Sequence, residues 1–116
     1  MSVTIYHNPR CSKSRQALEL LREHGIEPEI IEYLKTPPNA SEIKNLLSLL
    51  NCSPRDLMRQ KEAEYKDSGL DNPDLTDDEL IEALQQQPRL IERPIVVIDN
   101  QAIIARPPED LLKILP

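Results

Sequence analysis

The sequence lacks any apolar run long enough to cross a membrane. Its longest apolar stretches, such as Ile95–Ile98, fall far short of the ~20 residues that a spanning helix requires, so no membrane protein is indicated. The basic, apolar and small-residue regions of a secretory signal are also missing from the N-terminus. We therefore expect a cytoplasmic protein.

Cysteines are scarce as well, with only Cys11 and Cys52 in the chain. They lie far apart in the sequence, and together with the two histidines they match no metal-ligand spacing. We therefore expect no metal site, and in a reducing compartment we expect both thiols to be free.

Acidic side chains are missing from the start of the chain, where none occurs before Glu19, although the formal net charge is −6. An acidic protein is a poor partner for nucleic acid or anionic lipid, so neither is expected. Within four positions of Cys11 the chain instead carries His7, Arg10, Lys13 and Arg15. This local positive charge indicates either a site for a small anion or an ordinary solvated surface.

The length of 116 residues, with 39% hydrophobic and 29% charged residues, is typical of one folded domain and not of a disordered chain. We therefore expect residues 1–116 to form a single domain.

The first part of the chain has the pattern of a strand, a helix and a second strand. Alternating apolar residues predict a strand over 3–7, which Asn8 and Pro9 end. Spaced leucines predict a helix over 12–24, with Gly25 at the usual position of a left-handed cap. A second, β-branched strand is expected over 29–34, parallel to the first.

The middle of the chain, about residues 39–87, is expected to be all helical. Asn39 with Glu42, and Thr76 with Glu79, have the spacing of capping boxes that begin helices. Ser53 followed by proline predicts a further helix start.

The last part of the chain is expected to form a hairpin and a helix. Ile95–Ile98 has the composition of a buried strand, Asp99 and Asn100 a turn, and residues 102–105 its partner strand. The two prolines at 107 and 108 then begin a terminal helix. The resulting order, βαβ, helical insertion and ββα, predicts an α/β fold with a thioredoxin-like sheet.

Cys11 is the candidate nucleophile because it lies between the first strand and the first helix. Unpaired N–H groups at a helix start stabilise a thiolate and also bind anions, so one place can hold both the nucleophile and an oxyanion. The alternative is a loop cysteine without a role. Ser12 and Ser14 could bond the thiolate or cap the helix. His7 could assist proton transfer or make a structural hydrogen bond, and Arg15 could face the thiolate or the solvent.

Five segments of the sequence resemble the glutaredoxin-coupled arsenate reductase family. They are 7–15 (HNPRCSKSR), 33–38 (YLKTPP), 57–61 (LMRQK), 92–96 (ERPIV) and 105–109 (ARPPE), so the likeness spans nearly the whole chain. The resemblance implies that Cys11 attacks arsenate and that three arginines, Arg59, Arg93 and Arg106, bind the oxyanion. It also implies supporting roles for His7 and Arg15, with Ser14 beside them, and a cis bond between Arg93 and its proline.

The same resemblance implies that no cofactor is bound and that glutathione is the co-substrate, with glutaredoxin as the partner protein. Guanidinium groups suit tetrahedral oxyanions because their planar fork donates several hydrogen bonds. Arg93 and Arg106 both precede proline, which favours an extended backbone at the boundary of an element.

The chain departs from the family pattern beside Cys11, where Ser12 and Lys13 replace the usual Gly-Thr and Arg10 precedes the cysteine. The added positive charge still favours an oxyanion. Two other functions stay open on the sequence: a monothiol, glutathione-dependent oxidoreductase, and a non-enzymatic transcriptional regulator of the same fold. Such regulators typically carry C-x-x-C, whereas this chain has Ser14 at the second position. A low-molecular-weight phosphatase would need arginine in place of Ala17.

Cys52, which comes just before the expected helix start at Ser53, is interpreted as a buried structural thiol and not as a resolving thiol.

Overall fold

The structure is a computed structural model that describes residues 1–115, and the chain forms two compact units. Unit 1 comprises Met1–Thr36 together with the chain from Arg93 onward, and unit 2 comprises Pro37–Glu92. That both units belong to one domain, as the sequence predicts, stays a prediction.

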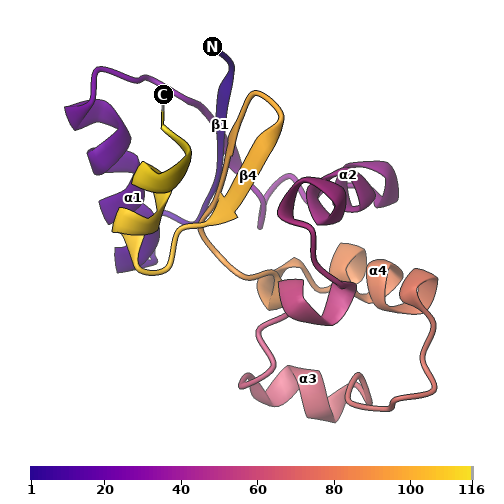
Figure 1. Cartoon of the computed structure of the whole chain (residues 1–116). Helices are drawn as coiled ribbons and strands as arrows, with labels where there is room; N and C mark the ends of the chain where they lie inside the picture. Colours follow the sequence, from indigo (N-terminus) through magenta and orange to yellow (C-terminus); the bar gives the residue numbers. More distant parts are fainter. Residues whose placement is uncertain (116) are drawn as a thin grey trace. The chain divides into compact units, whose positions relative to one another are not determined.

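Unit 1 is built on a four-stranded mixed sheet in the order β2-β1-β3-β4 (Figure 1). The strands are β1 (Val3–His7), β2 (Glu29–Glu32), β3 (Ile95–Ile98) and β4 (Gln101–Ile104). β1 pairs in parallel with β2 through the crossover helix α1 (Ser12–Glu23), and it pairs antiparallel with β3. β3 and β4 form the expected hairpin, with β4 starting one residue earlier than predicted.

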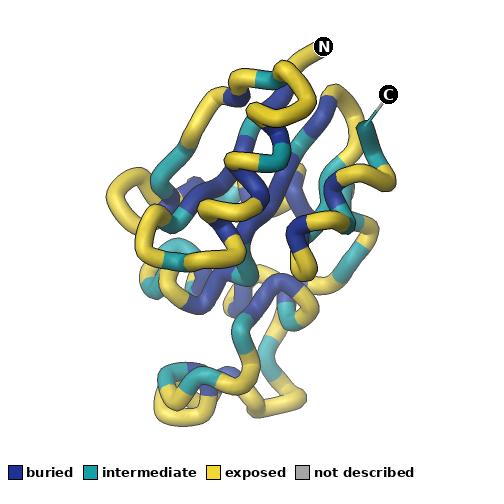
Figure 2. The backbone as a smooth tube through the Cα atoms, turned by 90° about the vertical axis from the view of Figure 1, so that its left-hand side faces the viewer, coloured by how far each residue is buried: buried dark blue, intermediate teal, exposed yellow. Residues whose placement is uncertain are grey.

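One face of the sheet is covered by α1 and by the C-terminal η3 (Pro108–Ile114), the yellow helix beside α1 in Figure 1. Their apolar side chains and those of the strands form the core of the unit: Val3, Ile5, Ala17, Leu18, Leu21, Val96, Ile98, Ala105 and Leu111. Buried residues therefore alternate with exposed ones along the helices, as Figure 2 shows.

The terminal helix expected after the two prolines is present, but it is a 3₁₀ helix. Its inward residues, Pro108, Leu111 and Ile114, recur every three positions. Side chains three apart line up on one face of a 3₁₀ helix, so this winding directs them all toward the core.

α1 ends in a Schellman motif at Gly25. The Gly25 N–H donates to the Arg22 carbonyl at 3.0 Å, and the Ile26 N–H donates to the Leu21 carbonyl at 3.0 Å. Gly25 has a φ of +75°, a left-handed conformation that only glycine adopts at little cost. The predicted left-handed cap is confirmed.

Unit 2 is helical, as predicted, and contains the expected insertion. Its elements are α2 (Ala40–Leu50), η1 (Pro54–Leu57), α3 (Ala63–Asp67), α4 (Asp77–Gln86) and η2 (Pro88–Leu90). The capping boxes of Asn39 with Glu42 and of Thr76 with Glu79 are both formed. Ser53 likewise caps a helix, but that helix is one short 3₁₀ turn.

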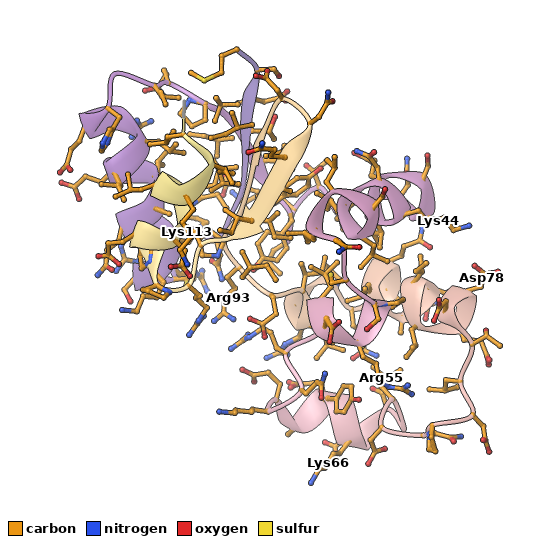
Figure 3. All side chains as sticks on the ribbon, viewed as in Figure 1. Lys44, Arg55, Lys66, Asp78, Arg93 and Lys113 are labelled. Carbon is orange, nitrogen blue, oxygen red and sulfur yellow. The ribbon has the colours of Figure 1, made fainter. Side chains whose placement is uncertain are left out.

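The core of unit 2 lies where α2 packs against α4. α2 contributes buried residues three or four positions apart, beginning at Ile43, and α4 contributes Leu80, Ile81 and Leu84. At the rim of this contact the Lys44 ammonium lies 3.7 Å from the Asp78 carboxylate (Figure 3). Exposed pairs of this kind add little stability, so the packing is mainly apolar.

The βαβ and ββα halves share one sheet, with the helical block between them in sequence, so the predicted thioredoxin-like α/β fold is confirmed. Among residues 1–115, no helix is long and apolar enough to cross a membrane.

Candidate active site

Cys11 lies in a tight loop at the start of α1, where it is the N-cap residue. Its backbone N–H donates to the Asn8 carbonyl at 3.0 Å, and its carbonyl accepts from the Arg15 N–H at 3.0 Å. The first turn of α1 carries no acidic residue that would compete with an anion. The loop therefore presents a half-buried thiol at the positive end of a twelve-residue helix.

The surroundings of Cys11 lower the pKa of its thiol. Partial burial alone would raise that pKa, but three groups outweigh it: the backbone N–H of Ser14, the guanidinium of Arg93 and the backbone N–H of Lys13. A thiolate is the nucleophilic form of cysteine, so these groups activate Cys11 for attack on an electrophile.

Ser14 joins the end of β1 to the loop. Its side chain is fully buried, and Oγ accepts from the Asn8 N–H at 3.0 Å and lies 2.6 Å from Nδ1 of His7. The sequence allowed two roles for the Ser14 hydroxyl, a hydrogen bond to the thiolate or a cap on the helix. The hydroxyl takes neither role, because it bonds His7 and the Asn8 N–H. It is the backbone N–H of Ser14 that stabilises the thiolate.

His7 ends β1 and is buried, with 6% of its surface exposed. Burial lowers the pKa of its ring, Glu32 opposes this, and Arg22 and Arg15 add to the lowering. The imidazole is therefore neutral at pH 7. Its hydrogen bond to Ser14 is the structural role that the sequence left open.

Arg93 is the arginine that the structure brings to Cys11, and Figure 3 shows it at the end of unit 1 where α1 begins. Its Nε and Nη1 atoms are buried, and neither donates a hydrogen bond to any residue of the described chain. The Arg93–Pro94 bond is cis, as expected. Buried donors nearly always have acceptors, so two unsatisfied guanidinium nitrogens beside a thiolate indicate a place for an anionic oxygen.

Arg106 and Arg15 are exposed arginines of unit 1. Arg106 follows β4, and its bond to Pro107 is also cis, which the sequence did not predict. The Arg15 Nη1 donates to the Pro9 carbonyl at 2.9 Å, so this side chain lies along the Cys11 loop.

Arg59 lies in unit 2, after η1, and its guanidinium already has partners within that unit. Its guanidinium forms an ion pair with Glu62 and donates to the Arg89 carbonyl at 3.4 Å. Its backbone N–H donates to the Leu90 carbonyl at 2.7 Å. An anion bound by Arg59 would therefore share it with a carboxylate.

Cys52 also lies in unit 2, and it is half-buried where the sequence predicted a buried thiol. Burial and the nearby Asp56 carboxylate raise the pKa of its thiol. It borders an open pocket of about 440 Å³ between α2, η1 and the start of α4. Its surroundings suppress the thiolate, in contrast to those of Cys11.

Two features of the site could not be read from the sequence. The Lys13 N–H acts through the backbone, which any residue would provide, and the buried nitrogens of Arg93 depend on tertiary packing.

In the part of the chain that is described, no group of three or more His, Cys, Asp or Glu side chains could hold a metal ion.

Comparison with known proteins links this geometry to one family. The model of the ArsC family matches residues 6–114. The uncharacterised protein YfgD of Escherichia coli K12 is 52% identical over 114 residues, which is 97% of this chain and 96% of that protein. The arsenate reductase of Neisseria meningitidis serogroup A is 48% identical over 97% of each chain. The solved structure of an arsenate reductase from Vibrio cholerae has a TM-score of 0.97 and 51% identity, covering 99% of this chain and 98% of that one.

Proposed function

The chain belongs to the ArsC family, and from this premise we propose that it reduces arsenate to arsenite, with Cys11 as the nucleophile. The observation that carries the proposal is the Arg93 guanidinium beside the Cys11 thiol, with two buried nitrogens that have no acceptor in the described chain. A thiol with a lowered pKa and an adjacent oxyanion donor are the two requirements of attack on arsenate.

In the first step, the Cys11 thiolate attacks arsenic and displaces one oxygen. The reaction is Cys11–SH + H₃AsO₄ → Cys11–S–AsO(OH)₂ + H₂O, and arsenic stays As(V). Negative charge accumulates on the arsenic oxygens as the S–As bond forms. Arg93 is placed to stabilise that charge, and the N–H groups at the start of α1 add to it.

We assign Arg106 and Arg59 to the same oxyanion. Arg106 is exposed, and its guanidinium makes no hydrogen bond or ion pair within residues 1–115, so its fork is available. Arg59 is paired with Glu62, which holds the guanidinium in one place and also weakens its field. His7 and Ser14 are assigned to positioning, since their hydrogen bonds fix the loop that carries Cys11.

The second step needs an external thiol, because reducing As(V) to As(III) takes two electrons. A single thiol supplies one of them when it enters a disulfide, and Ser14 cannot act as the second thiol. Glutathione attacks the Cys11 sulfur, and the S–As electron pair stays on arsenic: Cys11–S–AsO(OH)₂ + GSH → Cys11–S–S–G + As(OH)₃. Arsenic goes from As(V) to As(III) while two thiols become a disulfide. Glutaredoxin with a second glutathione then regenerates the Cys11 thiol and forms oxidised glutathione, a cycle that suits a cytoplasmic protein.

The test is arsenate turnover by the purified chain, with arsenite measured directly. We expect turnover that requires both glutathione and glutaredoxin and that stops when either is omitted. Thioredoxin with its reductase should not replace them. Full activity with thioredoxin in the absence of glutathione would overturn the monothiol cycle and give Cys52 a redox role.

A parallel assay separates this function from the monothiol alternative. The same protein is given a glutathione mixed disulfide in place of arsenate. Rapid reduction of the mixed disulfide, without any arsenite from arsenate, would reassign Cys11 to a general glutathione-dependent oxidoreductase. Inactivity in both assays would favour a non-enzymatic role.

A further inference from the structure

A hollow of about 370 Å³ lies along α1, one helical turn beyond Cys11. His7, Pro9, Arg15, Leu18, Glu19 and Arg22 line it. We propose that this hollow binds the thiol co-substrate as a γ-glutamyl tripeptide, with Arg15 and Glu19 holding its zwitterionic end. The inference rests on the proposed function, which requires an external thiol.

The hollow follows the face of α1 that carries Arg15, Glu19 and Arg22, and Cys11 is the N-cap residue four positions before Arg15. Residues four apart on a helix stack on one face, so Arg15 follows Cys11 and Glu19 follows Arg15. Each step advances about 6 Å along the axis, and helical side chains lean back toward the N-terminus. A tripeptide extends about 10 Å, so a ligand held by Arg15 and Glu19 can place its central thiol near the start of α1.

The charged groups of the hollow match one end of glutathione. The γ-glutamyl end carries an ammonium and a carboxylate on the same carbon. Arg15 uses Nη1 on the Pro9 carbonyl and keeps its other donors, and Glu19 forms no ion pair or hydrogen bond with any residue of 1–115. Arg15 and Glu19 have the spacing of an ion pair but do not form one, so both remain available.

The third charged group of the hollow is already occupied. Arg22 donates through Nε and Nη2 to both oxygens of Glu27, each at 2.9 Å. This forked pair already engages Arg22 with a carboxylate, so Arg22 is less available to a ligand anion than Arg15 is. The positive charge offered to a ligand is therefore concentrated at Arg15, on the side of the hollow toward Cys11.

The size and lining of the hollow favour a peptide over a bare oxyanion. Its volume falls in the range of small-molecule pockets, roughly 300–1,000 Å³, and far exceeds the needs of a tetrahedral anion. Pro9 and the largely buried Leu18 supply apolar surface for the methylene groups of a tripeptide. The neutral ring of His7 borders the same hollow and adds no charge that would repel the ligand's ammonium.

The test compares Glu19→Gln with Glu23→Gln, a matched change at an exposed position one turn further along α1. Steady-state kinetics are measured against glutathione at saturating arsenate. We expect Glu19→Gln to raise KM for glutathione roughly tenfold, as the loss of one charge-assisted contact implies, and Glu23→Gln to behave like wild type. 2-Mercaptoethanol, which has no zwitterionic end, should support Glu19→Gln and wild type equally.

A separate readout keeps this inference distinct from the proposed function. The Cys11–arsenic adduct is measured by mass spectrometry after arsenate is added without any thiol. If wild type forms no adduct, the proposed function fails. If wild type forms the adduct but Glu19→Gln keeps the wild-type KM for glutathione, the co-substrate binds elsewhere and this inference is wrong.

Discussion

Each unit carries one cysteine that directly precedes or begins a helical segment, and the two thiols have opposite surroundings. Cys11 begins the twelve-residue α1 and has Arg93 beside it, and the pKa of its thiol is lowered. Cys52 comes just before the four-residue η1 and has Asp56 nearby, and the pKa of its thiol is raised. A helix start is therefore not enough to activate a thiol. Burial raises the pKa of both thiols. At Cys11 the backbone N–H groups of Ser14 and Lys13 and the Arg93 guanidinium outweigh burial, whereas at Cys52 the Asp56 carboxylate adds to it.

The two units also differ in total charge. Unit 1 has equal numbers of acidic and basic residues, so the whole formal charge of −6 belongs to unit 2. The net negative charge of the protein therefore comes from residues outside the unit that carries Cys11. The net charge of −6 by itself would suggest a protein that repels oxyanions. The unit that carries Cys11, however, has no net charge and is basic around Cys11.

The largest expected effect separates the two cysteines. Cys11→Ser should abolish arsenate turnover, because a serine hydroxyl at neutral pH is a far weaker nucleophile than a thiolate. Cys52→Ser should retain most of the activity. Comparable losses in both variants would indicate an intramolecular disulfide relay and would erase the contrast between the units.

The next effect concerns the arginines of the two units. Replacing Arg93 by Lys keeps the charge but removes the planar fork, and we expect kcat/KM for arsenate to fall about 10- to 100-fold. Arg106→Lys and Arg59→Lys should also slow the reaction, and Arg59→Lys the least, because Glu62 already offsets its charge. Wild-type kinetics in all three lysine variants would remove these residues from the oxyanion site.

Alkylation with iodoacetamide as a function of pH measures the two thiols directly. A lowered pKa means that Cys11 ionises at lower pH than an ordinary thiol, so it should react first as pH rises. The raised pKa of Cys52 should delay its reaction to higher pH. Peptide mapping after short exposure resolves the two sites. Arg93→Gln should shift the Cys11 profile to higher pH and leave the Cys52 profile in place.

The smallest effect compares two matched glycines. Gly25 in unit 1 and Gly69 in unit 2 both close Schellman motifs with φ above +70°, and a Cβ at either would meet no atom within 4 Å. Each change to Ala should lower the free energy of unfolding by about 1 kcal/mol, from backbone conformation alone. Thermal or urea unfolding then tests the predicted single domain. If the chain is one domain, both variants should lower the midpoint of a single unfolding transition. Two transitions, each lowered by only one of the variants, would show two domains.

Much of the fold could be predicted because the decisive signals are local. The capping boxes at Asn39 and Thr76, the cap at Gly25 and the β3–β4 hairpin all depend on residues within a few positions of one another. The 3₁₀ winding of η1 and η3 was missed because it depends on which side chains the core accepts.

The site could be predicted only in part. Cys11 stands out because of its place between a strand and a helix, and the arginines were found only through resemblance to a family. The unsatisfied nitrogens of Arg93 and the bonds of the Ser14 hydroxyl are products of tertiary packing. No local pattern of residues encodes them.

The fully buried Ser14 limits how this chain can evolve. Changing it to cysteine replaces one oxygen by sulfur and would create the C-x-x-C motif of a dithiol enzyme. Sulfur is larger and a weak hydrogen-bond partner, so the change would disturb the contacts to His7 Nδ1 and the Asn8 N–H, which together hold the loop. A Ser14→Cys variant would therefore gain a second thiol but would hold the Cys11 loop less firmly. Compensating substitutions around His7 would have to come first, so the packing of Ser14 favours the external thiol that the proposed function requires.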